Sequence, residues 1–244
     1  MLDYGFRTKN GFNRSLRNLE TDRNFEYYGE MACRYDSVVH QGGYALAETI
    51  YSGATKLRQA DSLAVLDLGI GTGLVSEKFA RAGSSVTGID ASQEMLEMCK
   101  KKSFAKTLIL ADLSDGHIPN LSEYFDLVLC VGLIEFVRNI DRFFQSIAKA
   151  MKSGGNFVLA VRDISLNPRF TKMEWKGLVI DARAFEDHGL IAIHHHWPTV
   201  KEALERCGML IVREEEVFAY KSPTQHIDTM NRLVFLTYES GCNG

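Results

Sequence analysis

The stretch that decides the fold is VLDLGIGTGLVSEKFARAGSSVTGID, from Val65 to Asp90. It consists of an apolar run, a glycine-rich turn, a helix-like segment and a second apolar run that ends in an acid. Glycine in the turn permits positive φ and lets the backbone approach a ligand closely. An acid about 20 residues beyond such a turn can accept hydrogen bonds from ribose hydroxyls. The stretch therefore predicts a nucleoside site, against the plainer alternative of a tight turn that binds nothing.

The charge beside the turn distinguishes two kinds of nucleoside ligand. A dinucleotide site favours the spacing G-x-G-x-x-G and places a pyrophosphate at a helix N-terminus. In this sequence the spacing is G-x-G-x-G, and Asp67 stands just before it. An acid at that place favours a positively charged ligand and opposes a pyrophosphate. S-adenosylmethionine carries a sulfonium and an ammonium group and no phosphate, so the charge pattern favours it.

Length and composition indicate one globular domain. The chain has 244 residues, of which 45% are hydrophobic and 24% are charged, as is ordinary for a folded protein. A net charge of -3 opposes extensive binding to a polyanion. No apolar run approaches the roughly 18 residues that span a bilayer. The five cysteines are scattered and odd in number, which predicts a reduced, cytoplasmic protein.

Strand-like and helix-like segments alternate through the middle of the chain. The strand candidates are AVLDLG, SVTGID, TLILAD, FDLVLCVG and NFVLAV. All but SVTGID have the apolar character of strands buried on both faces, whereas SVTGID fits a strand nearer a sheet edge. The alternation predicts an α/β fold with a doubly wound, mostly parallel sheet. Two later runs, LIVREEEVFAY and NRLVFLTYE, predict an antiparallel pair of strands at the sheet edge.

Several motifs in this order resemble the class I S-adenosylmethionine-dependent methyltransferases, over residues 25–163 and more weakly to the end. VLDLGIGTG, VTGIDAS and ILADL are similar to the first three motifs of that family. FDLVLCVGLIEFV and AMKSGGNFVLAV are similar to its fourth-strand motif and to the segment that leads into strand five. YGEMACRYD is similar to the entry helix of many small-molecule members. The resemblance implies a Rossmann-like sheet of seven strands, with helices on both faces and an antiparallel C-terminal edge strand.

The resemblance also implies a set of cofactor-binding residues: Tyr28, Tyr35, Asp67, Gly69, Gly71, Asp90, Ala91, Met95, Asp112, Leu113 and Val131. By this analogy Asp67 holds the ammonium group of S-adenosylmethionine, Asp90 the ribose hydroxyls and Asp112 the adenine amino group. Met95 and Val131 have a competing interpretation as core residues. Tyr35 could be a packing residue, and Asp112 could cap a loop.

The acceptor is expected at the carboxyl ends of the strands, where ligands gather in open α/β sheets. Glu135, Arg162, the segment after strand five and the entry helices are predicted to build its pocket. Arg162 could pair an acidic substrate group or form a surface ion pair. Many quinone-pathway members carry Glu-His-Val after strand four, whereas this chain has Glu135, Phe136 and Val137. A mechanism that relies on that histidine is therefore in doubt.

The run IAIHHHW is the most conspicuous stretch of the predicted insertion. In an extended segment His194 and His196 would share one face, and His195 would point to the other. One interpretation is structural, and another makes His196 or His195 a substrate contact or base. Metal binding is the third interpretation, although no further ligand stands at a persuasive spacing. We predict no metal site.

The organisation that follows is one methyltransferase domain over residues 1–244. We divide it into an N-terminal arm with lid helices, a cofactor-binding core, an insertion over the acceptor pocket and a C-terminal part with a helix and edge strands, at residues 1–60, 61–163, 164–198 and 199–244. The sequence of the lid part predicts two helices with a break at QGG. Basic and aromatic residues of the arm could contact nucleic acid, but the acidic whole opposes it; they are Arg7, Lys9, Arg14, Arg17, Arg23, Tyr4, Phe6 and Phe12.

The predicted activity is methyl transfer from S-adenosylmethionine to an oxygen, nitrogen or carbon atom of a small metabolite. The product of the cofactor would be S-adenosylhomocysteine, and the protein would be a monomer or homodimer. Two alternatives stay open. One is a non-catalytic S-adenosylmethionine-binding sensor or partner protein, and the other is an NAD(P)-dependent oxidoreductase.

Overall fold

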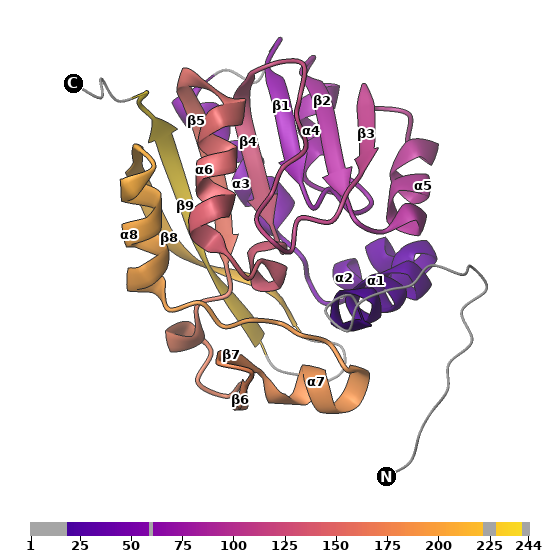
Figure 1. The fold of residues 1–244 in the computed structure, drawn as a ribbon. Coiled ribbons are helices and arrows are strands. Elements are labelled where there is room, and N and C mark those ends of the chain that lie inside the picture. Colours follow the sequence, from indigo (N-terminus) through magenta and orange to yellow (C-terminus); the bar gives the residue numbers. More distant parts are fainter. Residues whose placement is uncertain (1–18, 59–60, 222–227, 241–244) are drawn as a thin grey trace.

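The computed structural model describes residues 19–58, 61–221 and 228–240, which form an open sheet with helices on both faces (Figure 1). The sheet has seven strands in the spatial order β3-β2-β1-β4-β5-β9-β8. Its strands are β1 (Ala64–Leu68), β2 (Ser85–Asp90), β3 (Thr107–Leu110), β4 (Phe125–Val131), β5 (Met151–Val161), β8 (Met209–Lys221) and β9 (Asp228–Tyr238). The predicted doubly wound, mostly parallel sheet is confirmed.

Strand β1 lies at the centre of the sheet and fixes where a ligand can bind. It pairs in parallel with β2 on one side and with β4 on the other. Val65, Leu66 and Leu68 are fully buried, because helices cover both faces of a parallel sheet. The strand order reverses between β1 and β4. A crevice forms at such a reversal, beyond the carboxyl ends of the strands.

Helices lie on the two faces of this sheet and beyond the carboxyl ends of its strands (Figure 1). They are α1 (Leu19–Met31), α2 (Tyr35–Gln41), α3 (Leu46–Leu57), α4 (Ser76–Arg81), α5 (Gln93–Lys101), α6 (Ile140–Ala150), α7 (Ala182–His188) and α8 (Trp197–Arg206), with short 3-10 turns η1 (Ala32–Arg34), η2 (Ile134–Phe136) and η3 (Ile164–Leu166). Phe143 of α6 and Leu204 of α8 belong to the apolar cluster on one face. Ile50 of α3 and Phe79 of α4 belong to the cluster on the other face. In the part of the chain that the structure describes, no helix is long and apolar enough to traverse a bilayer.

The last two strands form the antiparallel pair predicted at one edge. β9, the final strand along the chain, runs antiparallel to both β5 and β8 and lies between them. Its residues Leu233, Val234 and Phe235 are fully buried. β8 therefore forms the edge of the sheet, and β9 joins it to the parallel strands.

Strand β3 forms the other edge, and its burial differs from the prediction for TLILAD. That run was expected to be buried on both faces, yet Thr107 and Leu110 are exposed. β3 pairs with β2 alone, so its outer side has no neighbouring strand. The mixed strand β2 lies one place inside the edge, as its sequence indicated.

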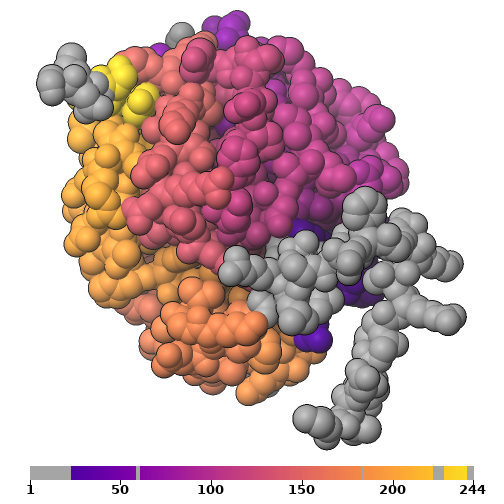
Figure 2. Space-filling view, viewed as in Figure 1, coloured from indigo at the N-terminus to yellow at the C-terminus, as the bar shows by residue number. Residues whose placement is uncertain are grey.

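The segments that differ most from a plain α/β sheet gather at the carboxyl ends of the strands. Figure 1 shows α1, α2 and α7 at that end of the molecule, and Figure 2 shows the insertion covering it. The insertion forms a two-stranded antiparallel sheet of β6 (Lys172–Trp175) and β7 (Leu178–Asp181), followed by α7. An extended segment, residues 190–195, comes next, and we call it the strap. The four-part division of the domain stays a prediction.

The N-terminal helices are more divided than the sequence predicted. α1, η1 and α2 follow one another up to the QGG break, where Gly43 adopts a φ of 76° before α3 begins. Of the residues considered for nucleic-acid contact, only Arg23 lies among the described ones, and it is exposed on α1.

Helix α3 approaches the sheet closely at Gly53. A Cβ atom at this position would lie 2.2 Å from the ring of Phe235 and 2.3 Å from the guanidinium of Arg213. Phe235 is fully buried, and the Arg213 guanidinium lies 4.0 Å from the centre of its ring. Packing against β9 therefore requires glycine in the middle of this helix.

We expect Gly53→Ala to destabilise the protein. Alanine gains up to about 1 kcal/mol of helix propensity, but overpacking a well-packed core costs about 1–3 kcal/mol. The free energy of unfolding, measured by urea denaturation, should fall by up to about 2 kcal/mol. Ser52→Ala, at an exposed position of the same helix, is the control and should not lower it. Stabilisation by both changes would contradict the close packing at Gly53.

Candidate functional site

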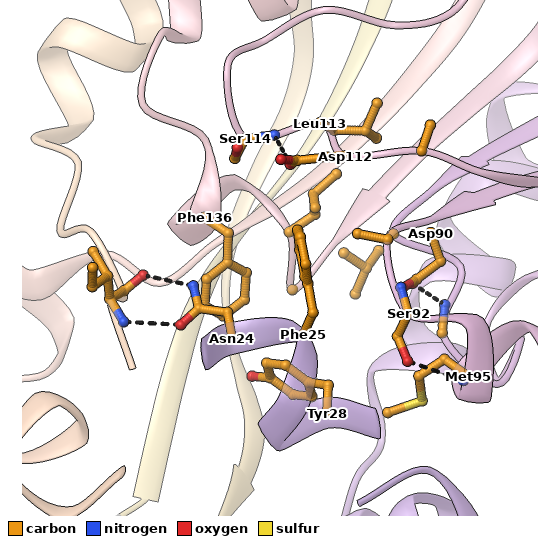
Figure 3. Close-up of a pocket in the computed structure, with 18 of the residues that line it drawn as sticks. Asn24, Phe25, Tyr28, Asp90, Ser92, Met95, Asp112, Leu113, Ser114 and Phe136 are labelled. Atoms are coloured by element: carbon orange, nitrogen blue, oxygen red, sulfur yellow. Dashed lines mark hydrogen bonds between the residues drawn. The ribbon is translucent and has the colours of Figure 1, made fainter. Parts of the chain in front are cut away.

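A first pocket lies beyond the carboxyl ends of β1, β2 and β4, next to α1 (Figure 3). It contains about 930 Å³ of space between its lining atoms. The structure brings together here all but one of the residues that were predicted to bind the cofactor. Those in its lining are Tyr28, Tyr35, Gly69, Gly71, Asp90, Ala91, Met95, Asp112, Leu113 and Val131.

The glycine turn forms one wall of the first pocket. Gly69 and Gly71 have φ values of 73° and 54°, a region that side-chain-bearing residues rarely occupy. A Cβ atom added at Gly71 would meet nothing within 4 Å, because the residue faces open space. The backbone of the turn is therefore directly available to a ligand.

Asp90 links this turn to the next helix. One carboxylate oxygen accepts a hydrogen bond from the Gly71 N–H at 2.8 Å, and the other accepts one from the Ser92 N–H at 2.9 Å. The Ser92 hydroxyl in turn accepts the N–H of Met95 at 3.2 Å and caps α5. Burial raises the pKa of Asp90, while the N–H groups of Ser92, Gly71 and Ala91 lower it. The acid is thus held in one orientation at the pocket wall.

Asp112 and Leu113 lie at another side of the first pocket, just after β3. Asp112 is exposed, and its Oδ1 accepts a hydrogen bond from the Ser114 N–H at 2.8 Å. Leu113 is buried, and with Ala91 and Met95 it gives the pocket an apolar part. A flat ring with a polar edge fits between such surfaces.

Asp67 is the one predicted cofactor residue that does not line the first pocket. It is 3% exposed and lies beneath the glycine turn. Burial raises its pKa to about 7, although the side-chain hydrogen bond with Ser76 lowers it, and the nearby charge of Asp90 acts in the same direction as burial. A carboxyl whose pKa lies near neutrality ionises when a positive charge comes near.

Helix α1 and the strap close the first pocket together. The side-chain amide of Asn24 donates to the Ile191 carbonyl at 3.3 Å and accepts the Ile191 N–H at 3.1 Å. Figure 3 shows this pair beside Phe25 and Phe136. The Asn24 amide bonds to the N–H and the carbonyl of one residue, as a neighbouring β-strand would. It thereby joins two segments that lie 167 residues apart in the chain.

Helix α2 is attached to the glycine turn and to α5 by Asp36. The Thr72 hydroxyl donates a hydrogen bond to the Asp36 carboxylate. The Lys102 ammonium lies 2.7 Å from the other oxygen of the same carboxylate. These contacts hold the entry helices over the carboxyl ends of the strands.

A second pocket adjoins the first and contains about 1380 Å³ of space between its lining atoms. It is lined by the entry helices, the insertion and the ends of β4 and β5. Both pockets share Tyr28, Tyr35, Val131, Gly132 and Phe136. The two spaces therefore meet at the end of β4.

The predicted substrate residues Glu135 and Arg162 both line the second pocket. Arg162 is not a surface residue, because its side chain is 16% exposed and lies 3.6 Å from Asp181. Burial lowers the pKa of Arg162, but Tyr220, Glu135, Tyr28 and Asp181 outweigh it and raise the pKa overall. Arg162 therefore stays charged within the pocket wall.

The structure places His195 and His196, the predicted substrate contacts, outside the lining of the two pockets. His196 is exposed at the start of α8, and the ring of His195 contacts the Ile134 carbonyl through Nε2 at 2.9 Å. Neither lines either pocket. His194 is buried, and neither of its ring nitrogens has a hydrogen-bond partner. Among the described residues no three of His, Cys, Asp and Glu gather in a group that could hold a metal ion.

Several lining residues were not recognised in the sequence. Asn24 and Phe25 begin the entry region, and Ile191 and Ile193 belong to the strap; no local motif marks them. Phe136 did carry a signal, because it replaces the histidine of the Glu-His-Val pattern. Its ring packs edge-on against Tyr28, with centroids 5.6 Å apart, at the junction of the two pockets.

Comparison with known proteins finds methyltransferases that are similar to part of this chain. Residues 66–159 match the model of a methyltransferase domain. Demethylmenaquinone methyltransferase from Tropheryma whipplei is 37% identical over 95 residues, which are 39% of this chain and 40% of that protein. Over this segment the chain is therefore similar to methyltransferases, as its sequence motifs indicated.

Two further methyltransferases are similar to this chain. Ubiquinone biosynthesis O-methyltransferase from Proteus mirabilis is 32% identical over 121 residues, 48% of this chain and 47% of that protein. The chain thus spans less than half the length of the curated relatives it matches. Magnesium protoporphyrin IX methyltransferase from Synechocystis PCC 6803 was solved with bound S-adenosylmethionine. It has a TM-score of 0.63 at 15% identity, over 93% of this chain and 100% of that one, which shows the shared fold.

Buried His194 should make folding stability depend on pH. Burial and the positive charge of Arg162 lower its pKa from 6.5 to about 4, so the unfolded chain binds its proton more readily than the folded protein does. The contribution of His194 to stability should therefore decrease as pH falls from about 6.5 to about 4, whereas Asp67, whose pKa is raised to about 7, contributes in the opposite direction. Melting temperatures across this range measure the effect.

His194→Phe should reduce this dependence, because it removes the titrating ring and leaves no unpaired polar atom. His117→Gln, at an exposed position, is the control. Its melting temperature should change with pH as that of the wild type does. If the melting temperature of His194→Phe changes with pH as in the wild type, His194 does not contribute to the pH dependence.

Proposed function

We propose that this protein transfers the methyl group of S-adenosylmethionine to an oxygen, nitrogen or carbon atom of a small metabolite. The junction of the two pockets at Val131 and Gly132 is the observation that carries this proposal. A nucleoside in the first pocket and an acceptor in the second would meet there. The relatives named above, which are methyltransferases of quinone biosynthesis by name, support the same reaction class.

The residues of the first pocket fit S-adenosylmethionine. Each oxygen of Asp90 holds one backbone N–H and can accept a further hydrogen bond, which suits a pair of ribose hydroxyls. Asp112 and the apolar surface of Leu113 and Met95 suit an adenine ring. The open space at Gly71 leaves room for the chain that bears the sulfur. When bound, the cofactor supplies a methyl group on a positively charged sulfur.

The protein's own contribution to methyl transfer is alignment and the exclusion of water. In-line displacement gains much of its rate from holding the reacting atoms at the correct distance and angle. α1 and the strap, joined through Asn24, cover the junction and keep bulk water away from it. Phe136 supplies no proton acceptor at the place where some quinone-pathway relatives carry histidine.

Two other functions are less well supported. An NAD(P)-dependent oxidoreductase would place a pyrophosphate near the glycine turn, where Asp67 and Asp90 carry or can develop negative charge. A sensor that binds the cofactor without turnover has no use for a second pocket open to the methyl position.

We further infer a small-molecule acceptor, a cytoplasmic location and a monomeric or homodimeric state.

The cofactor site can be tested with two glycines of similar backbone. Gly71 and Gly154 both have positive φ, and a Cβ atom at either would meet nothing within 4 Å. Gly71→Ala and Gly154→Ala should therefore cost a similar stability of about 1–2 kcal/mol. Only the methyl group at Gly71 would enter the first pocket, so only that variant should bind S-adenosylhomocysteine at least tenfold more weakly.

Calorimetric titration of both variants with S-adenosylhomocysteine and NADH measures this difference. Equal affinity of the two variants would place the ligand elsewhere. Binding of NADH alone would exclude methyl transfer and favour the oxidoreductase. Binding of S-adenosylhomocysteine without turnover on a broad panel of acceptors would favour the sensor.

Asp67 predicts a proton release when the cofactor binds. Its pKa of about 7 in the free protein should fall beside an ammonium group, because opposite charge favours the ionised form. At pH 7 binding should release up to about half a proton per site. Titrations in buffers of different ionisation enthalpy measure the release.

Asp67→Asn should abolish this component of the proton release, whereas Asp112→Asn should retain it as a matched change within the same site. Buffer-independent heats in the wild type would show that Asp67 does not hold the ammonium group.

A further inference from the structure

The second pocket has more negative than positive charge in its wall. Among the described lining residues, Glu135 and Asp181 flank one arginine, Arg162. Asp187 and His188 are further lining residues and are exposed. One guanidinium already paired with Asp181 is a poor anchor for an acidic substrate. The charge balance therefore favours a ligand that brings positive charge.

Glu135 has an unused acceptor in this wall. The residue is 3% exposed. Its Oε1 accepts the Arg162 backbone N–H at 3.1 Å, while Oε2 is buried without a hydrogen-bond partner. Buried polar atoms nearly always have a partner, from the protein, from water or from a ligand. A carboxylate oxygen left without one beside a pocket points to a donor group on the pocket's occupant.

Aromatic rings form much of the remaining wall. They belong to Tyr27, Tyr28, Tyr35, Tyr44, Phe136, Phe170 and Tyr220. Burial raises the pKa of Tyr28, Tyr35 and Tyr44 above the usual value, so these phenols are uncharged at neutral pH. The faces of such rings attract cations that lie within about 6 Å. The aromatic surface therefore favours a positively charged ligand, as the acidic residues do.

We propose that the acceptor is a small amine, cationic in solution, whose nitrogen binds Glu135 Oε2 among the tyrosine rings. This inference rests on the proposed function, because it assigns the second pocket to the methyl acceptor. A carboxylate acceptor would meet Glu135 and Asp181, and an alcohol would leave their surplus charge unbalanced.

The chemistry of transfer is consistent with this placement. An ammonium group has no lone pair, so it must first give one proton to the Glu135 carboxylate. The amine nitrogen then forms a bond to the methyl carbon as the carbon–sulfur bond breaks. The bonding electrons stay on sulfur, which becomes a neutral thioether, and the positive charge passes to the methylated nitrogen. No other reactant is needed.

Binding of matched probes tests the inference without relying on turnover. Phenethylamine, 2-phenylethanol and 3-phenylpropanoate share a phenylethyl group and differ only in the group that would face Glu135. Butylamine extends the test to an amine without a ring. Each is titrated calorimetrically into protein saturated with S-adenosylhomocysteine, whose own binding is measured first. We expect at least one amine to bind, and phenethylamine to bind at least tenfold more tightly than its alcohol and its acid.

Glu135→Gln keeps an oxygen for the Arg162 N–H and removes the charge, so it should abolish the preference for amine. Glu174→Gln, at an exposed position of the insertion, is the matched control and should keep it. The inference is overturned if the alcohol or the acid binds as tightly as the amine, if neither amine binds, or if Glu135→Gln keeps the preference. Protein that fails to bind S-adenosylhomocysteine would instead overturn the proposed function itself.

Discussion

The hydrogen bonds of the Asp90 carboxylate hold together the part of the molecule on which the rest of the site depends. Its two oxygens bind the N–H groups of Gly71 and Ser92, so the turn after β1 and the start of α5 keep a fixed relation. This geometry is only compatible with a residue at Gly71 that accepts positive φ without strain. The wall of the first pocket is therefore formed before any ligand arrives, and a rigid wall has little ordering entropy to lose on binding.

The parts of the fold that could be predicted are those encoded by contiguous runs of sequence. Val65 to Asp90 contains two strands, the turn and the acid in one segment, and the acid after β3 follows the same logic. Burial of β3 was predicted wrongly, because an apolar run does not reveal which strand lies at the edge. The place of β9 between β5 and β8 also depends on pairing across the sheet, which local pattern does not determine.

The closure of the first pocket and the lining of the second could be predicted only in outline, because distant segments build them. Asn24 meets Ile191 across 167 residues of chain, and neither residue has a motif. Periodicity put His194 and His196 on one face of an extended run, but His194 is buried and His196 is exposed, because α8 begins directly after His196. Phe136 was visible as a departure from a family pattern, although its place between the pockets required the three-dimensional structure.

Tyr28 and Tyr35 belong to the walls of both pockets, and this shared wall has a thermodynamic consequence. A ligand that immobilises these rings in one chamber reduces the conformational entropy that a second ligand must remove in the other. The two binding events are then coupled, and the coupling is reciprocal: the factor by which the first ligand changes affinity for the second equals the factor by which the second changes affinity for the first. Two pockets coupled in this way would fill together at lower concentrations of both ligands than two independent sites would require.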